Sequence, residues 1–200
     1  FRGNAMTEAA KGIDSAMVAV LNLDRAKLQE ACDKAADLGV VQIANYNCPG
    51  QLVIAGEKAA VEQAAVYAKE LGARRCMPLN TSGPFHTKLL EPASKALHDY
   101  FQTISFGEMR FPVLFNCLGN VKEDNATIQS LLERQVMSSV YMEDTIRRMA
   151  ELGVDTIVEI GPGKVLSGFV KKTAADIKTY AITTAEDLQS VVAELKGAAQ

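Results

Sequence analysis

Three amphipathic segments of this chain end in the dipeptide Leu-Gly, and a run of strand-forming residues follows each of them at once. Glycine most readily takes the left-handed backbone conformation that closes a helix, so each dipeptide predicts a helix C-terminus. The dipeptides are Leu38-Gly39, Leu71-Gly72 and Leu152-Gly153. The apolar stripes at helical spacing before them are Leu28, Ala31, Cys32 and Ala35; Val61, Ala64, Ala65 and Ala68; and Met142, Ile146, Met149 and Ala150. This alternation of half-buried helices and strands predicts an α/β fold.

Four strand candidates surround the first two of these helices. They are Ser15 to Leu23, Val40 to Asn45, Gln51 to Ala55 and Ala73 to Leu79. The order strand, helix, strand, strand, helix, strand is that of the split-βαβ, ferredoxin-like unit. A turn-forming tetrapeptide, Asn47-Cys48-Pro49-Gly50, can join the two middle strands as a hairpin, and Asp24 is a natural N-cap for the first helix.

From residue 84 onward, helices alternate with near-continuous apolar runs. The runs are Pro112 to Cys117, Asp155 to Ile160 and Thr179 to Thr183. Such runs between helices are typical of a parallel sheet covered on both faces. Three strands are few for such a sheet, so we expect its other strands in a segment before Phe1. The opening Phe1-Arg2-Gly3, which lacks an initiator Met, also indicates a piece of a longer chain.

The composition argues against several classes of protein. Of 200 residues, 48% are hydrophobic and 22% are charged, as in ordinary globular domains. The net charge of −3 includes no basic run, so nucleic acid is not an expected partner. Charges interrupt every apolar segment before it reaches the ~18 residues of a membrane helix. The four cysteines form no CxxC pair, which indicates neither a disulfide framework nor a zinc site and favours a reducing cytoplasm.

His86 is the main candidate for a reactive group. It ends the turn Thr81-Ser82-Gly83-Pro84-Phe85-His86 between a strand and a helix, where α/β folds display functional side chains. Imidazole titrates near neutral pH and can take up and return a proton, as a general base in acyl transfer must. The alternative is a loop histidine without a chemical role. His98 lies off the apolar stripe of its helix and is expected on the surface.

Two further side chains are candidates on their chemistry alone. Gln135 follows Ile128 and Leu131 on the apolar face of its helix, where a buried amide would need a hydrogen-bond partner; a position at the edge that reaches water is the alternative. Arg2 could bind a carboxylate through two parallel hydrogen bonds, and an exposed terminal arginine is the alternative.

Known catalytic loops are not found in the sequence. Gly161-Pro162-Gly163-Lys164 has neither dinucleotide-binding nor Walker spacing and predicts a tight strand-to-helix turn. No Gly-x-Ser-x-Gly nucleophile elbow occurs in the 200 residues. Nothing in the sequence activates Cys48, which we interpret as a small apolar residue. A nucleophile for His86 is therefore outside this chain or absent.

Several motifs in order resemble the malonyl-CoA:acyl carrier protein transacylase family of fatty-acid synthesis, in its portion after the nucleophile elbow. The motifs are Phe1-Arg2-Gly3-Asn4-Ala5-Met6, Asn45-Tyr46-Asn47-Cys48-Pro49-Gly50-Gln51 with Val53-Ile54-Ala55-Gly56, Ser82-Gly83-Pro84-Phe85-His86, Arg134-Gln135 and Glu159-Ile160-Gly161-Pro162-Gly163-Lys164-Val165-Leu166. The resemblance covers nearly the whole chain. It implies part of an α/β-hydrolase-like parallel-sheet core, residues 1–12 and 81–200, with an inserted ferredoxin-like subdomain, residues 13–80.

The resemblance also implies a function. It is the transfer of a malonyl group from malonyl-CoA to the phosphopantetheine thiol of acyl carrier protein by a Ser-His ping-pong mechanism, with no cofactor besides the coenzyme A thioester that serves as substrate. The serine would lie in an N-terminal segment of the same enzyme, so this chain alone should be inactive.

Each candidate site residue has a counterpart in the family. His86 matches the catalytic histidine, Arg2 the arginine that holds the malonyl carboxylate, and Gln135 the residue whose main chain orients the histidine. The remaining matches are Asn45 and Asn47, in a loop that lines the cleft between subdomains, and Phe85. Phenylalanine is the residue type that malonyl-selective members of the family have at this last position.

Two other functions stay open at this point. The absent nucleophile and the ferredoxin-like unit fit a non-catalytic ligand-binding module. An acyltransferase domain of a polyketide synthase would share the same chemistry. Arg74, Arg75 and Lys88 are candidates for meeting an acidic carrier protein, and solvated surface charges without such a role are the alternative.

Overall fold

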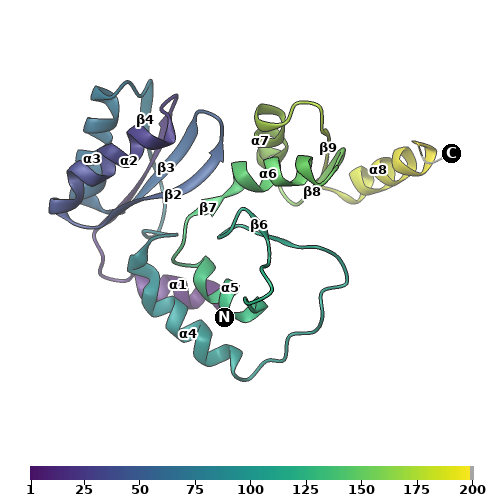
Figure 1. Ribbon diagram of the computed structural model, residues 1–200, viewed down its shortest axis with the longest axis horizontal. Helices are drawn as coiled ribbons and strands as arrows, with labels where there is room; N and C mark the ends of the chain where they lie inside the picture. Colours follow the sequence, from purple (N-terminus) through teal and green to yellow (C-terminus); the bar gives the residue numbers. More distant parts are fainter. Residues whose placement is uncertain (199–200) are drawn as a thin grey trace. The chain divides into compact units, whose positions relative to one another are not determined.

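A computed structural model describes residues 1–198 of the chain as a mixed α/β fold, which divides into the units Phe1–Thr145 and Ile146–Gln200 (Figure 1). The first unit contains α1 (Arg2–Ala10), β1 (Ser15–Leu21), α2 (Arg25–Ala35), η1 (Ala36–Leu38), β2 (Val41–Cys48), β3 (Gln51–Glu57), α3 (Lys58–Glu70), β4 (Arg75–Leu79), η2 (Lys88–Leu90), α4 (Glu91–Phe101), β5 (Leu114–Phe115), β6 (Asn120–Val121), α5 (Ile128–Gln135) and β7 (Val140–Tyr141). Helix α6 (Met142–Glu151) begins in this unit. β8 (Thr156–Ile160), α7 (Val165–Thr173), β9 (Lys178–Ile182) and α8 (Ala185–Ala198) follow in the second.

The first unit is built on a five-stranded sheet with the strand order β4-β1-β3-β2-β7. The first four strands are antiparallel to their neighbours, and β7 is parallel to β2. All four strands expected in this region are present. β1 ends at Leu21 and not at Leu23, because Asn22 takes a positive φ of 58° and its N–H donates to Gly50 O at 2.8 Å.

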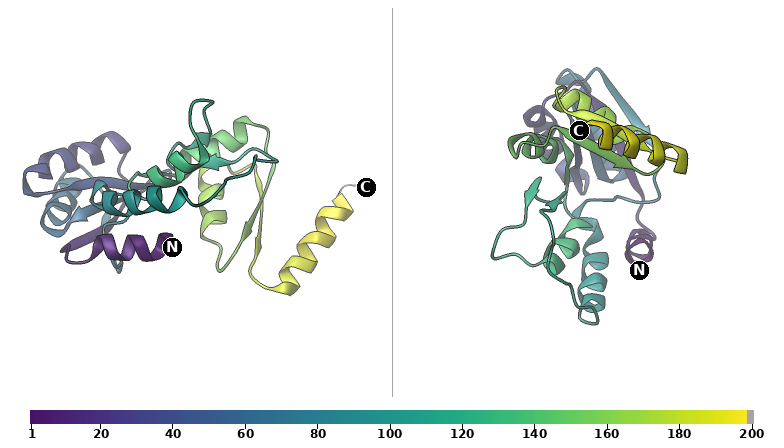
Figure 2. Two further views of the ribbon diagram at one scale, coloured as in Figure 1. Left: turned by 90° about the horizontal axis from the view of Figure 1, so that it is seen from below. Right: turned by 90° about the vertical axis from the view of Figure 1, so that its right-hand side faces the viewer.

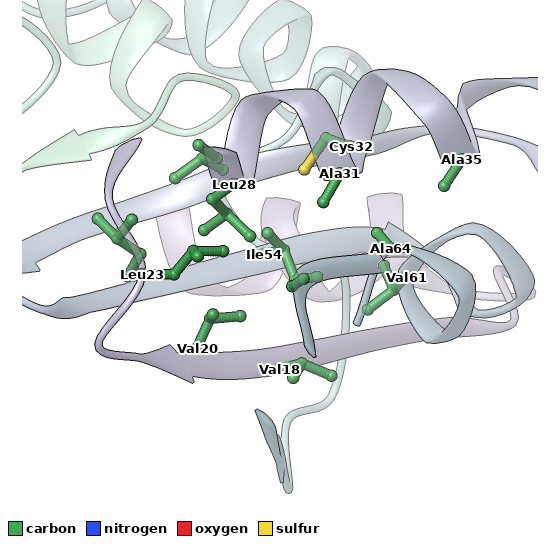
Figure 3. Close-up of a cluster of buried hydrophobic side chains, with 13 residues drawn as sticks. Val18, Val20, Leu23, Leu28, Ala31, Cys32, Ala35, Ile54, Val61 and Ala64 are labelled. Carbon is green, nitrogen blue, oxygen red and sulfur yellow. The ribbon is translucent and has the colours of Figure 1, made fainter. Parts of the chain in front are cut away.

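Helices α2 and α3 pack on one face of this sheet. Leu28 and Cys32 from α2 meet Ile54 of β3, and Val61 of α3 joins the same buried cluster (Figure 3). Fully burying a side chain such as Leu28 stabilises the fold by about 1.5–3 kcal/mol. Asp24 caps α2 as expected, since its Oδ1 accepts from Lys27 N at 2.9 Å.

The Leu-Gly helix ends are confirmed for α3 and α6, whereas α2 ends at Ala35 and Leu38-Gly39 instead ends the 3-10 helix η1. Gly39, Gly72 and Gly153 have φ values of 138°, 105° and 82°. The third stripe is only partly right, because Ala150 is exposed, whereas Ile146 is buried. In α6 the buried side also includes the polar residues Glu143 and Thr145, which apolar spacing does not reveal.

The expected parallel arrangement of three apolar runs is wrong for the first run. Pro112 to Cys117 contributes only β5, which pairs antiparallel with β6. The chain reverses between them because Leu118 N and Gly119 N both donate to Phe115 O at 2.9 Å, with Gly119 at a φ of 65°. β8 and β9 do pair in parallel, as Figure 2 shows, and the Gly161 to Lys164 turn connects β8 to α7 as expected.

Two elements of the first unit were not anticipated. The segment Arg2–Ala10, for which no helix was predicted, is the helix α1, whose Met6 is buried with Leu90 and Leu97 of the α4 region. β7 adds a fifth strand to the sheet. Both elements contribute to the surroundings of His86.

Candidate functional site

His86 lies in a tight loop that follows β4. Phe85 N donates to Gly83 O at 3.0 Å, and the buried Thr87 hydroxyl donates to Pro84 O at 2.7 Å. His86 itself takes a left-handed φ of 62°, a conformation that non-glycine residues seldom adopt. Such strain costs about 1–3 kcal/mol and is concentrated at functional sites. The loop therefore holds the imidazole in one orientation at an energetic cost.

The orientation of the ring is fixed by two main-chain carbonyls. Nδ1 of His86 lies 3.1 Å from Gln135 O and 3.2 Å from Ser138 O. A carbonyl oxygen only accepts hydrogen bonds, so Nδ1 must carry the proton. In the neutral ring, Nε2 is then the acceptor, and it has no hydrogen-bond partner among residues 1–198. His86 thus presents a free basic nitrogen.

The surroundings lower the pKa of His86 below its ordinary value of 6.5. Burial is the largest cause, because it disfavours the charged ring. The carbonyls of Gln135 and Ser138 oppose this effect, and the positive charge of Arg2 adds to it. The ring is therefore neutral at neutral pH, as a general base must be.

Phe85 and Asn45 lie on the face of the sheet opposite α2 and α3. Phe85 packs against a buried cluster on that face, which consists of Met17, Ala19, Ala44, Val53 and Ala55. Asn45 pairs with Val53 in the β2–β3 ladder and so belongs to the same face. Asn47 follows two residues later, so both asparagines lie on strand β2 and not in the expected loop, and both are half-buried.

Arg2 is exposed in the first turn of α1. It forms no ion pair or hydrogen bond within the described residues, yet its charge acts on the pKa of His86. Its guanidinium is thus available near the imidazole for an anionic group from outside the chain.

The structure brings the predicted residues together to different degrees. His86 contacts the main chain of Gln135 directly, Phe85 is its neighbour in sequence, and Arg2 acts on it through charge. Asn45 shares a sheet face with Phe85, and among the described residues no hydrogen bond links Asn47 to His86. Their catalytic and binding roles stay predictions.

Other expectations about individual residues can also be compared with the structure. His98 is exposed as expected, with Nδ1 at 3.2 Å from Glu133 Oε2. Sequence reasoning missed Ser138, whose carbonyl no side-chain pattern reveals. It also missed Ser139, for which the only signal is its place before the strand-forming pair Val140-Tyr141.

Among residues 1–198, no group of three or more His, Cys, Asp or Glu side chains lies close enough to hold a metal ion. No helix over the same residues has both the length and the apolar character needed to cross a membrane.

The fold and site define an α/β protein with a neutral histidine held through Nδ1 by main-chain carbonyls and with a free arginine nearby. No protein-family model matches the chain. It is 41% identical over 196 residues to the malonyl CoA-acyl carrier protein transacylase of Bacillus subtilis (strain 168), which covers 98% of this chain and 62% of that relative.

Solved structures agree with this match. The crystal structure of malonyl CoA-acyl carrier protein transacylase from Clostridium perfringens superposes with a TM-score of 0.92 at 40% identity, covering 98% of this chain and 62% of that one. A malonyl-transacylase in complex with a type II PKS acyl-carrier protein gives a TM-score of 0.89 at 36% identity, over 94% of this chain and 61% of that one. Over nearly its whole length the chain is similar to malonyl CoA-acyl carrier protein transacylases, and it spans about 62% of the length of the curated relative from Bacillus subtilis.

Proposed function

We propose that this chain supplies the general base and the carboxylate-binding arginine of an enzyme that transfers malonyl from malonyl-CoA to the phosphopantetheine thiol of acyl carrier protein. One observation carries the proposal: Nδ1 of His86 lies within hydrogen-bond distance of Gln135 O and Ser138 O, which leaves Nε2 free. The names of the relatives support the same activity.

The nucleophile of the proposed reaction is a serine in an N-terminal segment of the same enzyme. The absence of a Gly-x-Ser-x-Gly motif from these 200 residues and the 62% coverage of the relative support this view. The 200-residue chain alone is therefore expected to be inactive.

His86 moves the proton in both halves of the proposed reaction. Nε2 accepts the serine proton as the serine oxygen attacks the thioester carbonyl, and the tetrahedral intermediate collapses by breaking the C–S bond. The imidazolium then protonates the departing coenzyme A thiolate. In the second half, Nε2 takes the proton of the phosphopantetheine thiol, the thiolate attacks the malonyl-serine ester, and the serine regains its proton. The transfer involves no net oxidation or reduction, so these steps require no redox cofactor.

Specificity for malonyl would come from the other candidate residues. Arg2 would hold the free carboxylate by a charge-assisted hydrogen bond, an interaction of about 1.5–3 kcal/mol that acetyl-CoA lacks. Phe85 would occupy the space that a methyl branch needs. Asn45 and Asn47 would line the cleft.

The proposed fold assignment also follows from the similarity to the transacylases. Residues 13–80 would form a ferredoxin-like subdomain, which the strand order β4-β1-β3-β2 supports. Residues 1–12 and 81–200 would belong to an α/β-hydrolase-like core, completed by the N-terminal segment. These boundaries stay predictions.

Acyl carrier protein is the proposed macromolecular partner. A related malonyl-transacylase was solved in complex with such a carrier. Arg74, Arg75 and Lys88 are exposed and could meet an acidic carrier surface. A cytoplasmic location stays part of the proposal. The names of the relatives favour neither a non-catalytic module nor a polyketide-synthase domain.

The test uses the chain extended at its N-terminus by the natural upstream sequence. With holo-acyl carrier protein and malonyl-CoA, this protein should form malonyl-carrier protein, and His86→Ala should lower kcat/KM by about 10²–10⁴-fold. His98→Ala, which removes an exposed histidine, is the matched control and should leave the rate unchanged. Full activity of His86→Ala would exclude His86 as the general base. An upstream gene sequence without a nucleophile elbow would favour the non-catalytic module.

A further inference from the structure

The segment after α5 joins the histidine to the sheet. Ser138 places its carbonyl 3.2 Å from Nδ1 of His86, and the next residue, Ser139, donates from Oγ to Ile43 O of β2 at 2.6 Å. β7 begins at Val140, directly after these two serines. One peptide bond therefore separates the carbonyl that holds the ring from a hydroxyl that is bound to the sheet.

β7 itself is a short attachment, although Tyr141 N also donates to Asn116 O at 2.8 Å. It pairs with β2 over only two registers, Asn45 with Val140 and Tyr46 with Tyr141. A cavity of about 240 Å³ lies beside this pairing and is lined in part by Tyr46, Ser139 and Tyr141. Water in such a space can compete for the backbone groups of a short strand. Side-chain anchors must therefore contribute to the position of the segment.

A second anchor lies at the other end of β7. Arg25 of α2 donates from Nη1 and Nη2 to the two carboxylate oxygens of Asp144, each at 2.9 Å, and lies 3.2 Å from Glu143. The same guanidinium lies 4.7 Å from the centroid of the Tyr46 ring, which stacks on Tyr141 with 5.0 Å between centroids. This cluster holds the far end of β7 to α2 and β2, so only the near end depends on Ser139.

We propose that Ser139 is a positioning residue: its hydrogen bond to Ile43 O fixes the peptide plane that presents Ser138 O to Nδ1 of His86. The inference rests on the proposed function, in which His86 must keep Nε2 free. Ser139 contacts no reacting atom. It strengthens the preference for a proton on Nδ1 that Gln135 O also supports, because a carbonyl that moves away no longer favours that tautomer.

The first test needs no catalysis. Long-range ¹H–¹⁵N NMR of the 200-residue chain reports the tautomer and the pKa of each histidine, and His86→Gln assigns the signals. Ser139→Ala should increase the Nε2–H tautomer of His86 and lower its pKa further, because the Ser138 carbonyl favours the protonated ring. The signals of His98 should not change.

Matched variants separate positioning from general damage. Ser190→Ala removes a hydroxyl that also donates to a main-chain carbonyl, Glu186 O at 3.0 Å, and should leave His86 unchanged. Ser139→Thr keeps the hydroxyl and should restore the wild-type tautomer. If Ser139→Ala does not fold, Ser139→Cys replaces it, because a thiol is a weaker donor of similar size. An unchanged tautomer and pKa of His86 in the folded variant would overturn the proposal.

The second test measures transfer in the N-terminally extended protein. Ser139→Ala should lower kcat by about 10–100-fold with KM for malonyl-CoA unchanged, since a displaced catalytic group costs rate more than binding. The acid limb of the kcat profile should move to lower pH. If the extended wild-type protein transfers no malonyl, the proposed function fails, while the NMR result still decides the role of Ser139.

Discussion

At the scale of single residues, the protonation of His86 follows from neighbours that act in opposite directions. Burial and the charge of Arg2 lower its pKa, and the carbonyls of Gln135 and Ser138 raise it. Burial is the largest effect, so the ring stays neutral at neutral pH. The carbonyls then determine which nitrogen is free. Burial thus dominates the charge state, whereas the carbonyls, which oppose it, determine the tautomer.

Replacing Arg2 by alanine tests the electrostatic part of this account. The pKa of His86 should rise toward 6.5, because the variant removes a positive charge that disfavours the imidazolium. NMR titration of the 200-residue chain measures this change. In the extended protein, the preference for malonyl-CoA over acetyl-CoA should fall by about 10–100-fold, which corresponds to one charge-assisted hydrogen bond.

Lys11→Ala is the control for Arg2→Ala, because Lys11 is an exposed cation just after α1 and pairs with Glu8. It should change neither the pKa of His86 nor the substrate preference. An unchanged preference of Arg2→Ala for malonyl-CoA over acetyl-CoA would exclude Arg2 as a substrate-binding residue.

At the scale of elements, local signals predict helix ends better than they predict pairing. Asp24 is the N-cap of α2, and Gly39 and Gly72 follow the ends of helices as expected. These signals act through hydrogen bonds and dihedral angles within a few residues. By contrast, Pro112 to Cys117 has the composition of a buried strand but supplies only the short hairpin strand β5. Which strand this segment pairs with depends on the fold and not on the residues of the segment itself.

The N-cap of α2 offers a quantitative test. Asp24→Ala should lower the free energy of unfolding by about 0.5–2 kcal/mol, because the Lys27 N–H loses its acceptor. Urea unfolding of the 200-residue chain measures the change. Asp14→Ala is the control, since the Asp14 side chain is exposed and makes no hydrogen bond in the described structure. Equal stability of the two variants would contradict the capping role.

At the scale of the whole molecule, every candidate site residue belongs to the unit Phe1–Thr145. Within this unit, α1, the His86 loop, β2 and the segment after α5 are far apart in the sequence. Their packing places a neutral histidine in a half-buried position. The stability of the unit therefore depends on the protonation of His86.

The sign of this dependence follows from the lowered pKa. The unfolded chain binds a proton at His86 more readily than the folded chain does. The stability from neutral His86 is present above about pH 6.5 and is lost as the pH falls through that value, down to the lower folded pKa. Urea unfolding at several pH values between 5 and 8 measures this loss. The slope of the unfolding free energy against pH should correspond to the uptake of about one proton per molecule on unfolding. His86→Gln should remove it, whereas His98→Gln should retain it.

The sequence by itself determined the α/β class, the four strands around α2 and α3 and most helix ends, and it indicated the similarity to the transacylases and His86 as the candidate base. These features depend on local periodicity, turn chemistry and ordered motifs. Only the tertiary structure decided that α1 is a helix, that β7 joins β2, and that the carbonyls of Gln135 and Ser138 hold the imidazole. The reason is physical: main-chain carbonyls are the same at every position, so their contacts with His86, 49 and 52 residues away, depend on how the elements pack.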